Sequence, residues 1–413
     1  SSLSSSGSTG VGLKLYNHGT ISSTKDTIWM GSGSAGAPRS RGVKIYNYDG
    51  GTITSSGQSA IIGKYLTDSE IINYEGATIQ AEGRYGIMTE KSSDLTITNH
   101  GTIESTNNSI YCRECSDITF TNTGTITAAQ NTVLIGAHNN SGGDSITITN
   151  SGTITATTSN AALTSSGTDG AVITNTGSIN GVGRGIHVNE VDNSTITNHG
   201  TITATGTSGY GIWYENDGTN RVNNTLNNFG TISAAEGTAA DGIGIGKSAR
   251  AMFNITINNS GTITGSDNSI LILNSSSTGI DIVTKGEGTY EGEIDLNSTA
   301  TTMTLDCSIS KDQKIEIHNK TSMVITSNLC GNDTYEILDS NSDADADNSE
   351  TNGFLYVYGE DLDIDSHNKK YRTEIFLGKL NNIFNSTDEN EEQRTYYSAQ
   401  KRDNIYKNYE NGV

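Results

Sequence analysis

Leu95-Thr96-Ile97-Thr98-Asn99-His100-Gly101-Thr102-Ile103 is one copy of a pattern that occurs ten times along this chain. In each copy the asparagine is followed by a short turn with a glycine and then by an isoleucine. Successive asparagines are 23 to 31 residues apart, and repeats of this length indicate a solenoid, a propeller or an array. The ten asparagines are Asn17, Asn47, Asn73, Asn99, Asn122, Asn150, Asn175, Asn198, Asn228 and Asn259.

In each copy the apolar residues alternate with threonine or other polar residues, as they do in a half-buried β-strand. Neighbouring side chains of a strand point to opposite faces, so Leu95, Ile97 and Asn99 share one face and the threonines share the other. The isoleucine after the turn belongs to a second strand, and most copies continue into a third apolar run such as Gly86-Ile87. We therefore predict an all-β fold, a right-handed three-sided parallel β-helix. A propeller fits worse because its blades need four strands and about 40 residues.

The inward asparagines predict a ladder of side-chain amides. Successive turns of a β-helix lie about 4.8 Å apart, which is the strand spacing of a sheet. Each carboxamide can then donate to one neighbour and accept from the other, so that these buried polar groups all have partners.

The composition excludes several classes of partner. The 413 residues carry a net charge of −21 and a pI of about 4.6, which argues against nucleic acid and anionic lipid as ligands. No run of 18 apolar residues is present, so no membrane-spanning helix is expected. Only 32% of the residues are hydrophobic, as in disordered chains. Their strict placement nevertheless fits the narrow core of a β-helix. We expect no cofactor.

The repeat signature divides the chain into three parts. Residues 1–283 contain the ten repeats. Residues 284–362 hold further strands without the signature, and we expect them to form an atypical C-terminal cap, because a solenoid must protect its open end. Residues 363–413 are polar and are expected to form a linker with some helical character.

Four cysteines predict two local disulfides in an oxidising compartment. Cys307 and Cys330 are 23 residues apart, which is one turn, and residues one turn apart lie within disulfide range. Cys112 and Cys115 would close a small loop. A redox site is disfavoured because no βαβ context surrounds this C-x-x-C, and a four-cysteine zinc site because the two pairs lie several turns apart.

The repeated Ile-Thr-Asn-x-Gly-Thr-Ile-Thr resembles the passenger region of bacterial autotransporters, the type V secreted proteins of Gram-negative bacteria. The resemblance covers residues 13 to about 358. It implies a right-handed β-helix with a stable C-terminal cap, displayed on the outer-membrane surface or secreted. In that family a linker helix and a membrane β-barrel follow the passenger, and this chain holds no barrel. Many members resemble adhesins or self-association factors.

We expect a non-enzymatic extracellular protein that mediates adhesion, cell–cell association or self-association. Its partners would be other copies of itself, or glycans and proteins of cell surfaces. Aromatic side chains predicted to point outward are the candidate contacts, since rings pack well against sugars or partner chains. They are Tyr16, His18, Tyr46, Tyr48, Tyr74 and His100 near the N-terminus, with Trp213 and Tyr214 in a later segment.

Two other functions stay open. Polysaccharide-degrading enzymes also use β-helices, but the acidic residues are scattered and no catalytic cluster is visible. An ice-binding solenoid would display Thr-x-Thr arrays such as Thr153 and Thr155, although Gln80, Glu104 and Asn180 interrupt them. A calcium loop at 343–354 is disfavoured, because Asn348 stands where the glycine is needed and Phe354 where the glutamate is needed. We therefore predict no metal site.

Overall fold

A computed structural model of the chain describes residues 3–5, 12–31, 40–136, 143–158, 160–216, 222–235, 239–247, 250–297, 299–310, 313–329, 334–339 and 353–358. By its internal contacts the chain divides into residues 1–360 and residues 361–413, and every described residue belongs to the first unit. The predicted linker 363–413 lies outside these residues, and so does the acidic loop 339–353 apart from its end residues Asp339 and Gly353, which belong to strands.

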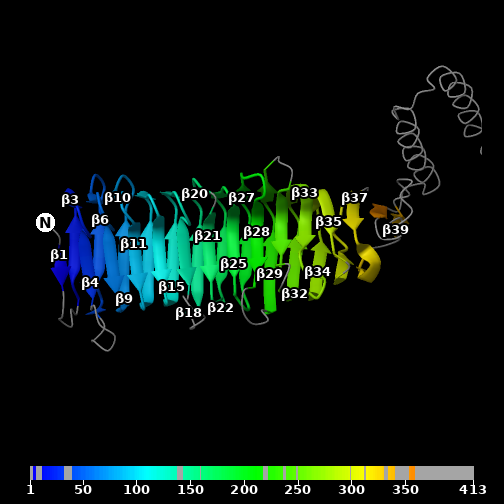
Figure 1. Cartoon of the computed structure of the whole chain (residues 1–413), viewed down its shortest axis with the longest axis horizontal. Coiled ribbons are helices and arrows are strands. Elements are labelled where there is room, and N and C mark those ends of the chain that lie inside the picture. The colour runs from blue at the N-terminus through cyan, green and yellow to red at the C-terminus, as the bar shows by residue number, and fades with distance from the viewer. Residues whose placement is uncertain are drawn as a thin grey trace, which may run out of the picture. The chain divides into compact units, whose positions relative to one another are not determined.

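The first unit is a parallel β-solenoid of about eleven turns, which confirms the predicted fold class (Figure 1). Each regular turn contains three short strands, and each strand pairs in parallel with its counterpart in the next turn. The first strands form a sheet of their own. The second and third strands belong to one larger sheet, since β33 (Thr262–Ile272) spans both positions and pairs with each preceding strand.

The first strands are β2 (Lys14–Asn17), β6 (Lys44–Asn47), β9 (Leu66–Asn73), β12 (Ser93–Asn99), β15 (Ser116–Asn122), β19 (Ile146–Asn150), β23 (Val172–Asn175), β26 (Thr195–Asn198), β29 (Val222–Asn228), β32 (Phe253–Asn259), β34 (Thr278–Thr284), β36 (Ala300–Leu305) and β38 (Val324–Ser327), with β5 (Ser40–Arg41) beside β9. The second strands are β3 (Thr20–Ser23), β7 (Thr52–Ser55), β10 (Thr78–Ala81), β13 (Thr102–Ser105), β16 (Thr125–Ala128), β20 (Thr153–Ala156), β24 (Ser178–Gly181), β27 (Thr201–Ala204) and β30 (Thr231–Ala234).

The third strands are β4 (Ile28–Gly31), β8 (Ile61–Lys64), β11 (Tyr85–Glu90), β14 (Asn108–Arg113), β17 (Val133–Gly136), β21 (Ala161–Ser166), β25 (Arg184–Asn189), β28 (Tyr210–Glu215) and β31 (Asp241–Ile245), with β1 (Leu3–Ser5) paired to β4. β35 (Thr289–Asp295) and β37 (Gln313–His318) continue the stack in parallel. Two further strands, β18 (Gly143–Asp144) and β22 (Thr168–Asp169), pair beside the solenoid, and a 3-10 turn covers Lys320–Ser322. In the described part of the chain, no helix has the length and hydropathy needed to cross a bilayer.

The core is a stack of isoleucines and asparagines. Ile53, Ile79 and Ile103 lie in register on successive second strands, and none of them is exposed. Beside them the ten asparagines form a continuous ladder, in which each Nδ2 donates to the Oδ1 of the next asparagine at 2.7–2.9 Å. All these bonds run in the same direction along the chain. They satisfy amides that would otherwise be buried without partners.

The ladder ends at a threonine and a tyrosine. Thr284 takes the next position in register after Asn259, and its hydroxyl lies 3.1 Å from the Tyr290 hydroxyl. Burial raises the pKa of Tyr290 to about 12, so the phenol stays protonated. Parallel stacking nevertheless continues beyond this point through β36–β38 and β35–β37. Beyond these strands the pairing changes from parallel to antiparallel.

The C-terminal end is closed by antiparallel strands. β40 (Gly353–Tyr358) pairs antiparallel with β37 on one side and with β39 (Thr334–Asp339) on the other. Leu355 and Val357 of β40 are fully buried. Antiparallel pairing occupies the edge of β37 that a further parallel turn would need, so this hairpin terminates the stack.

Paired left-handed residues form several of the corners that join a third strand to the next first strand. Examples are Tyr65 with Asp68 and Lys91 with Asp94, all with φ between 50° and 55°. The residue after the first left-handed position turns inward, and at this place Leu66 and Cys115 are fully buried. The strain of these non-glycine conformations is offset by a corner that repeats from turn to turn and bonds to its neighbours.

The amide ladder generates a stability prediction. Asn150→Ala removes the donor to the Oδ1 of Asn175 and the side-chain acceptor of Asn122, which leaves a buried oxygen unpaired and Asn122 with backbone acceptors only. We expect a loss of about 2–5 kcal/mol in unfolding free energy, measured by chemical denaturation. Thr149→Ala, on the outward side of the same strand, should change it by less than about 1 kcal/mol. Equal losses in both variants would contradict a stabilising ladder.

Candidate functional site

The outward positions of the second strands carry a long column of hydroxyl groups. Its members, in register from turn to turn, are Thr20, Thr52, Thr78, Thr102, Thr125, Thr153, Ser178, Thr201, Thr231, Thr262 and Thr289. Some of them bond directly, as Thr52 does to Thr20 at 3.0 Å. The neighbouring column is less uniform, because Gln80, Glu104 and Asn180 stand in register with threonines.

A second outward column is aromatic, and we call it the aromatic ridge: Tyr16, His18, Tyr46, Tyr48, Tyr74 and His100. His18 stacks on Tyr48 with ring centroids 4.4 Å apart and planes 2° apart, and Tyr48 stacks on Tyr74 at 4.7 Å and 5°. His100 ends the row at 6.3 Å from Tyr74, and its Nδ1 lies 2.7 Å from the Thr123 hydroxyl. The structure thus brings these six candidates together on successive turns.

Stacking decides which part of each ring a partner can reach. Rings one turn apart cover each other's faces, so the ridge presents mainly edges, with the phenol oxygens and imidazole nitrogens, to solvent. Tyr16 is more than half exposed, whereas the hydroxyl of Tyr46 donates to Glu70 at 2.7 Å, beside the ion pair of Glu70 with Lys44. Burial and the neighbouring tyrosines raise the pKa of Tyr48, so its phenol remains a hydrogen-bond donor.

The same column contains a pair that the sequence reasoning missed. His199 and Phe229 follow Asn198 and Asn228, and their rings stack at 4.7 Å and 7°. Phe229 is 53% exposed. Reading the residue after every ladder asparagine, rather than after the first four only, would have found them.

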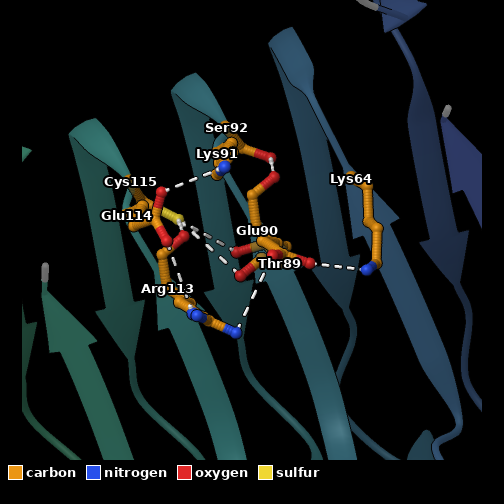
Figure 2. A network of polar contacts seen from close by, with 8 residues as sticks. All are labelled: Lys64, Thr89, Glu90, Lys91, Ser92, Arg113, Glu114 and Cys115. Carbon is orange, nitrogen blue, oxygen red and sulfur yellow. Dashed lines mark hydrogen bonds and ion pairs between the residues drawn. The ribbon is translucent and has the colours of Figure 1, made fainter. Parts of the chain in front are cut away.

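Charged side chains concentrate on the third strands (Figure 2). Lys64 pairs with Glu90 at 2.6 Å, and Lys91 pairs with Glu114 at 3.3 Å. Arg113 lies between the two glutamates, 3.5 Å from Glu114 and 3.9 Å from Glu90. Each cation therefore lies near a carboxylate of an adjacent turn or residue. The cluster links successive turns through ion pairs and does not present a row of cations to an anionic ligand.

The predicted Cys112–Cys115 pair lies at this corner. The two cysteines form a disulfide with Cα atoms 5.9 Å apart, and neither is exposed. The hydroxyl of Thr89, one turn earlier, donates to the Cys112 sulfur at 2.9 Å. Cys307 is also in a disulfide. Its expected partner Cys330 lies outside the described residues.

Farther along the third strands, Trp213 is the centre of a second cluster. The Arg184 guanidinium lies 4.0 Å above its ring, and His187 and Tyr210 stack at 5.1 and 5.2 Å. Its indole nitrogen donates to the carbonyl of Gly246 at 3.0 Å. Trp213 is therefore half-buried among its neighbours and apart in sequence and strand type from the aromatic ridge.

Tyr214 is not a contact residue, contrary to the sequence prediction. The segment is a strand, β28, so Trp213 and Tyr214 point to opposite sides, and Tyr214 lies in the core between Val188 and Ile245. Its side chain is fully buried, and burial raises the pKa of its phenol. The error came from treating two adjacent aromatic residues as an exposed loop, whereas the strand period of two had to separate them.

Two carboxyl groups near the Trp213 cluster, those of Glu215 and Asp241, have pKa values shifted in opposite directions. Burial disfavours the charge of Glu215, but hydrogen bonds from His187 and Lys247, each at 2.8 Å, outweigh it and lower the pKa to about 2. Burial raises the pKa of Asp241 to about 6, and the hydrogen bonds from Asn268 only partly oppose this. At neutral pH both groups are ionised, and Glu215 has basic partners on both neighbouring turns.

One group of potential metal ligands occurs among the described residues, and the sequence reasoning missed it. Glu293, Glu316 and His318 lie on adjacent strands with one donor atom each within 4.8 Å of the others. Burial and the carboxylates around Glu293 raise its pKa, against the effect of His318.

Residues 2–184 match a family model described as the BigA third pectate lyase-like domain, BigA being an autotransporter-like adhesin. The match covers the part of the solenoid that contains the aromatic ridge and the charged cluster. No curated protein and no solved structure matches the chain. The chain is thus similar to a β-helical, pectate lyase-like domain of an adhesin-like family.

Asp241 predicts a pH dependence of stability. Its folded pKa of about 6 lies above the unfolded value, so its contribution is fully present below about pH 4 and is lost as the pH rises through 6. Asp241→Asn keeps the hydrogen-bond acceptor without the charge. We expect it to raise the unfolding free energy at pH 7 by about 1–3 kcal/mol and to leave it nearly unchanged at pH 4. Asp117→Asn, at an exposed corner, should show no such difference. Denaturation at both pH values measures this, and a stabilisation independent of pH would contradict it.

Proposed function

We propose that this chain is a non-enzymatic binding module, secreted or displayed on a cell surface, that mediates adhesion or self-association through its outward columns. The aromatic ridge carries the proposal. It presents polar ring edges in a straight row on successive turns, adjacent to columns of threonine hydroxyls. Such a row can form the same hydrogen bond many times with a flat or repetitive partner.

Repetition compensates for weak individual contacts. Each exposed hydrogen bond contributes little alone, because it replaces a bond to water. When many contacts are held on one rigid scaffold, the first one raises the effective concentration of the rest. The fixed register of the solenoid supplies this rigidity over about eleven turns.

The charge and the disulfides are consistent with this setting. At −21, two copies repel each other at low ionic strength, and salt screens that repulsion. Self-association through hydrogen bonds and ring edges should therefore strengthen as salt is added. Disulfides persist outside the reducing cytosol, which supports an extracellular location.

A polysaccharide lyase is the second candidate, and the Trp213 cluster is the observation that favours it. A lyase needs a base that reaches the proton next to a uronate carboxylate, and cations that neutralise that carboxylate. Arg184, His187 and Lys247 are basic and lie together. Yet His187 and Lys247 are bonded to Glu215, and Arg184 lies over the Trp213 ring. These engagements favour binding over catalysis.

The ridge can be tested with a double variant. Tyr48→Ala with Tyr74→Ala removes the two central rings, and we expect binding to cells or to other copies to weaken by about tenfold or more. Adhesion assays and sedimentation at two salt concentrations measure this. The far-ultraviolet circular dichroism spectrum should not change, because these rings lie outside the core.

Ser151→Ala with Thr176→Ala is the matched control, since both residues occupy the same column on later turns and are exposed. It should leave binding intact. Unchanged binding in the tyrosine variant would refute the ridge as the contact. If the purified chain instead depolymerises an acidic polysaccharide, and Arg184→Gln or Lys247→Gln abolishes that activity, the lyase interpretation replaces this proposal.

A further inference from the structure

Three potential metal ligands lie on the outer side of the last parallel strand pair, outside the surface used in the proposed function. β35 and β37 pair with Ile294 opposite Ile317, and both isoleucines are buried. Since side chains alternate along a strand, Glu293, Glu316 and His318 all point to the outer side. The buried isoleucines fix the register, and the register holds the three donors together.

The distances suit a small ion. The imidazole of His318 lies between the two carboxylates, with Nδ1 3.0 Å from Glu293 and Nε2 3.6 Å from Glu316, and one of these nitrogens would bind the ion. One donor atom of each residue lies within 4.8 Å of the other two. Donors around a tetrahedral ion at about 2.1 Å are about 3.4 Å apart, so side-chain movements that shorten the separations by at most about 1.4 Å close the site. The three side chains are 26% to 42% exposed, which leaves them room to move and an ion a path to enter.

The charge balance also favours a cation. The carboxylates of Glu293 and Glu316 lie close to each other, and Asp267 and Asp295 add to the negative potential at Glu293. The imidazole of His318 is the neighbour that opposes this potential at Glu293, and Lys314 is on the same side of β37. Like charges on adjacent strands are unfavourable unless a positive group lies between them.

We propose that Glu293, Glu316 and His318 bind one zinc ion. An imidazole with two carboxylates is a donor set that suits zinc, whereas calcium and magnesium prefer oxygen ligands alone. Three protein ligands leave a fourth position for water. The ion would join β35 of the solenoid to β37, whose other edge pairs with β40 of the cap. Zinc would therefore stabilise the C-terminal end, because it binds the folded state only.

The test is a zinc titration of the chelator-treated full chain by calorimetry, together with thermal unfolding with and without zinc chloride. We expect one saturable site and a higher unfolding temperature with zinc. His318→Gln and Glu316→Gln should each weaken binding by roughly tenfold or more and abolish the thermal shift. His199→Gln, an exposed histidine on another turn, should change neither. Circular dichroism before titration establishes that each variant is folded.

Two results would overturn the site. The first is no saturable zinc binding by the parent chain. The second is zinc binding that persists in both His318→Gln and Glu316→Gln, which would place the ion elsewhere. Calcium that binds as tightly as zinc and independently of His318 would also refute it, since the imidazole would then not be a ligand.

Discussion

Every turn depends on register, and the amide ladder is the interaction that is least tolerant of a register error. A slip of one residue would turn the asparagines outward and bring threonines into the core. Isoleucines alone would tolerate a shift of two residues, because many first strands carry two inward apolar residues that are two positions apart. An amide tolerates neither shift, because its donor and acceptor must both meet partners in a core that is closed to solvent.

Because the ladder fixes the inward positions, the outward positions are free to vary. The second strands use them for an almost unbroken row of threonines, and the third strands use them for charged and aromatic clusters. The same register that stacks the core also brings outward side chains of adjacent turns within contact distance. Ion pairs such as Lys64 with Glu90 and stacked rings such as Tyr48 with Tyr74 both follow from it.

The fold could be predicted from the sequence because its signals repeat. Ten copies of one pattern outweigh local ambiguity, and the asparagine spacing alone indicates one turn per copy. Features that occur only once in the chain were harder to predict. Tyr214 was misplaced because Trp213 and Tyr214 were considered together, although the strand alternation puts Tyr214 in the inward column of Val188 and Ile245. His199 and Phe229 were missed because threonine and serine separate them from the first aromatic residues of the column. The Glu293, Glu316 and His318 group arises after the signature stops, where no sequence period indicates which residues face each other.

The stacking of the rings in the aromatic ridge decides which kind of partner they can contact. An isolated exposed tyrosine offers a sugar its face, and face stacking is where most of the apolar contact lies. In the centre of the ridge the repeat distance brings His18, Tyr48 and Tyr74 so close that their facing surfaces are already covered. The ridge is therefore better suited to edge contacts with an ordered partner, such as a second solenoid or a repetitive surface, than to gripping single sugar rings. Sugar stacking would instead be confined to rings at the ends of a stack, such as Tyr16 or Phe229, which are each 53% exposed.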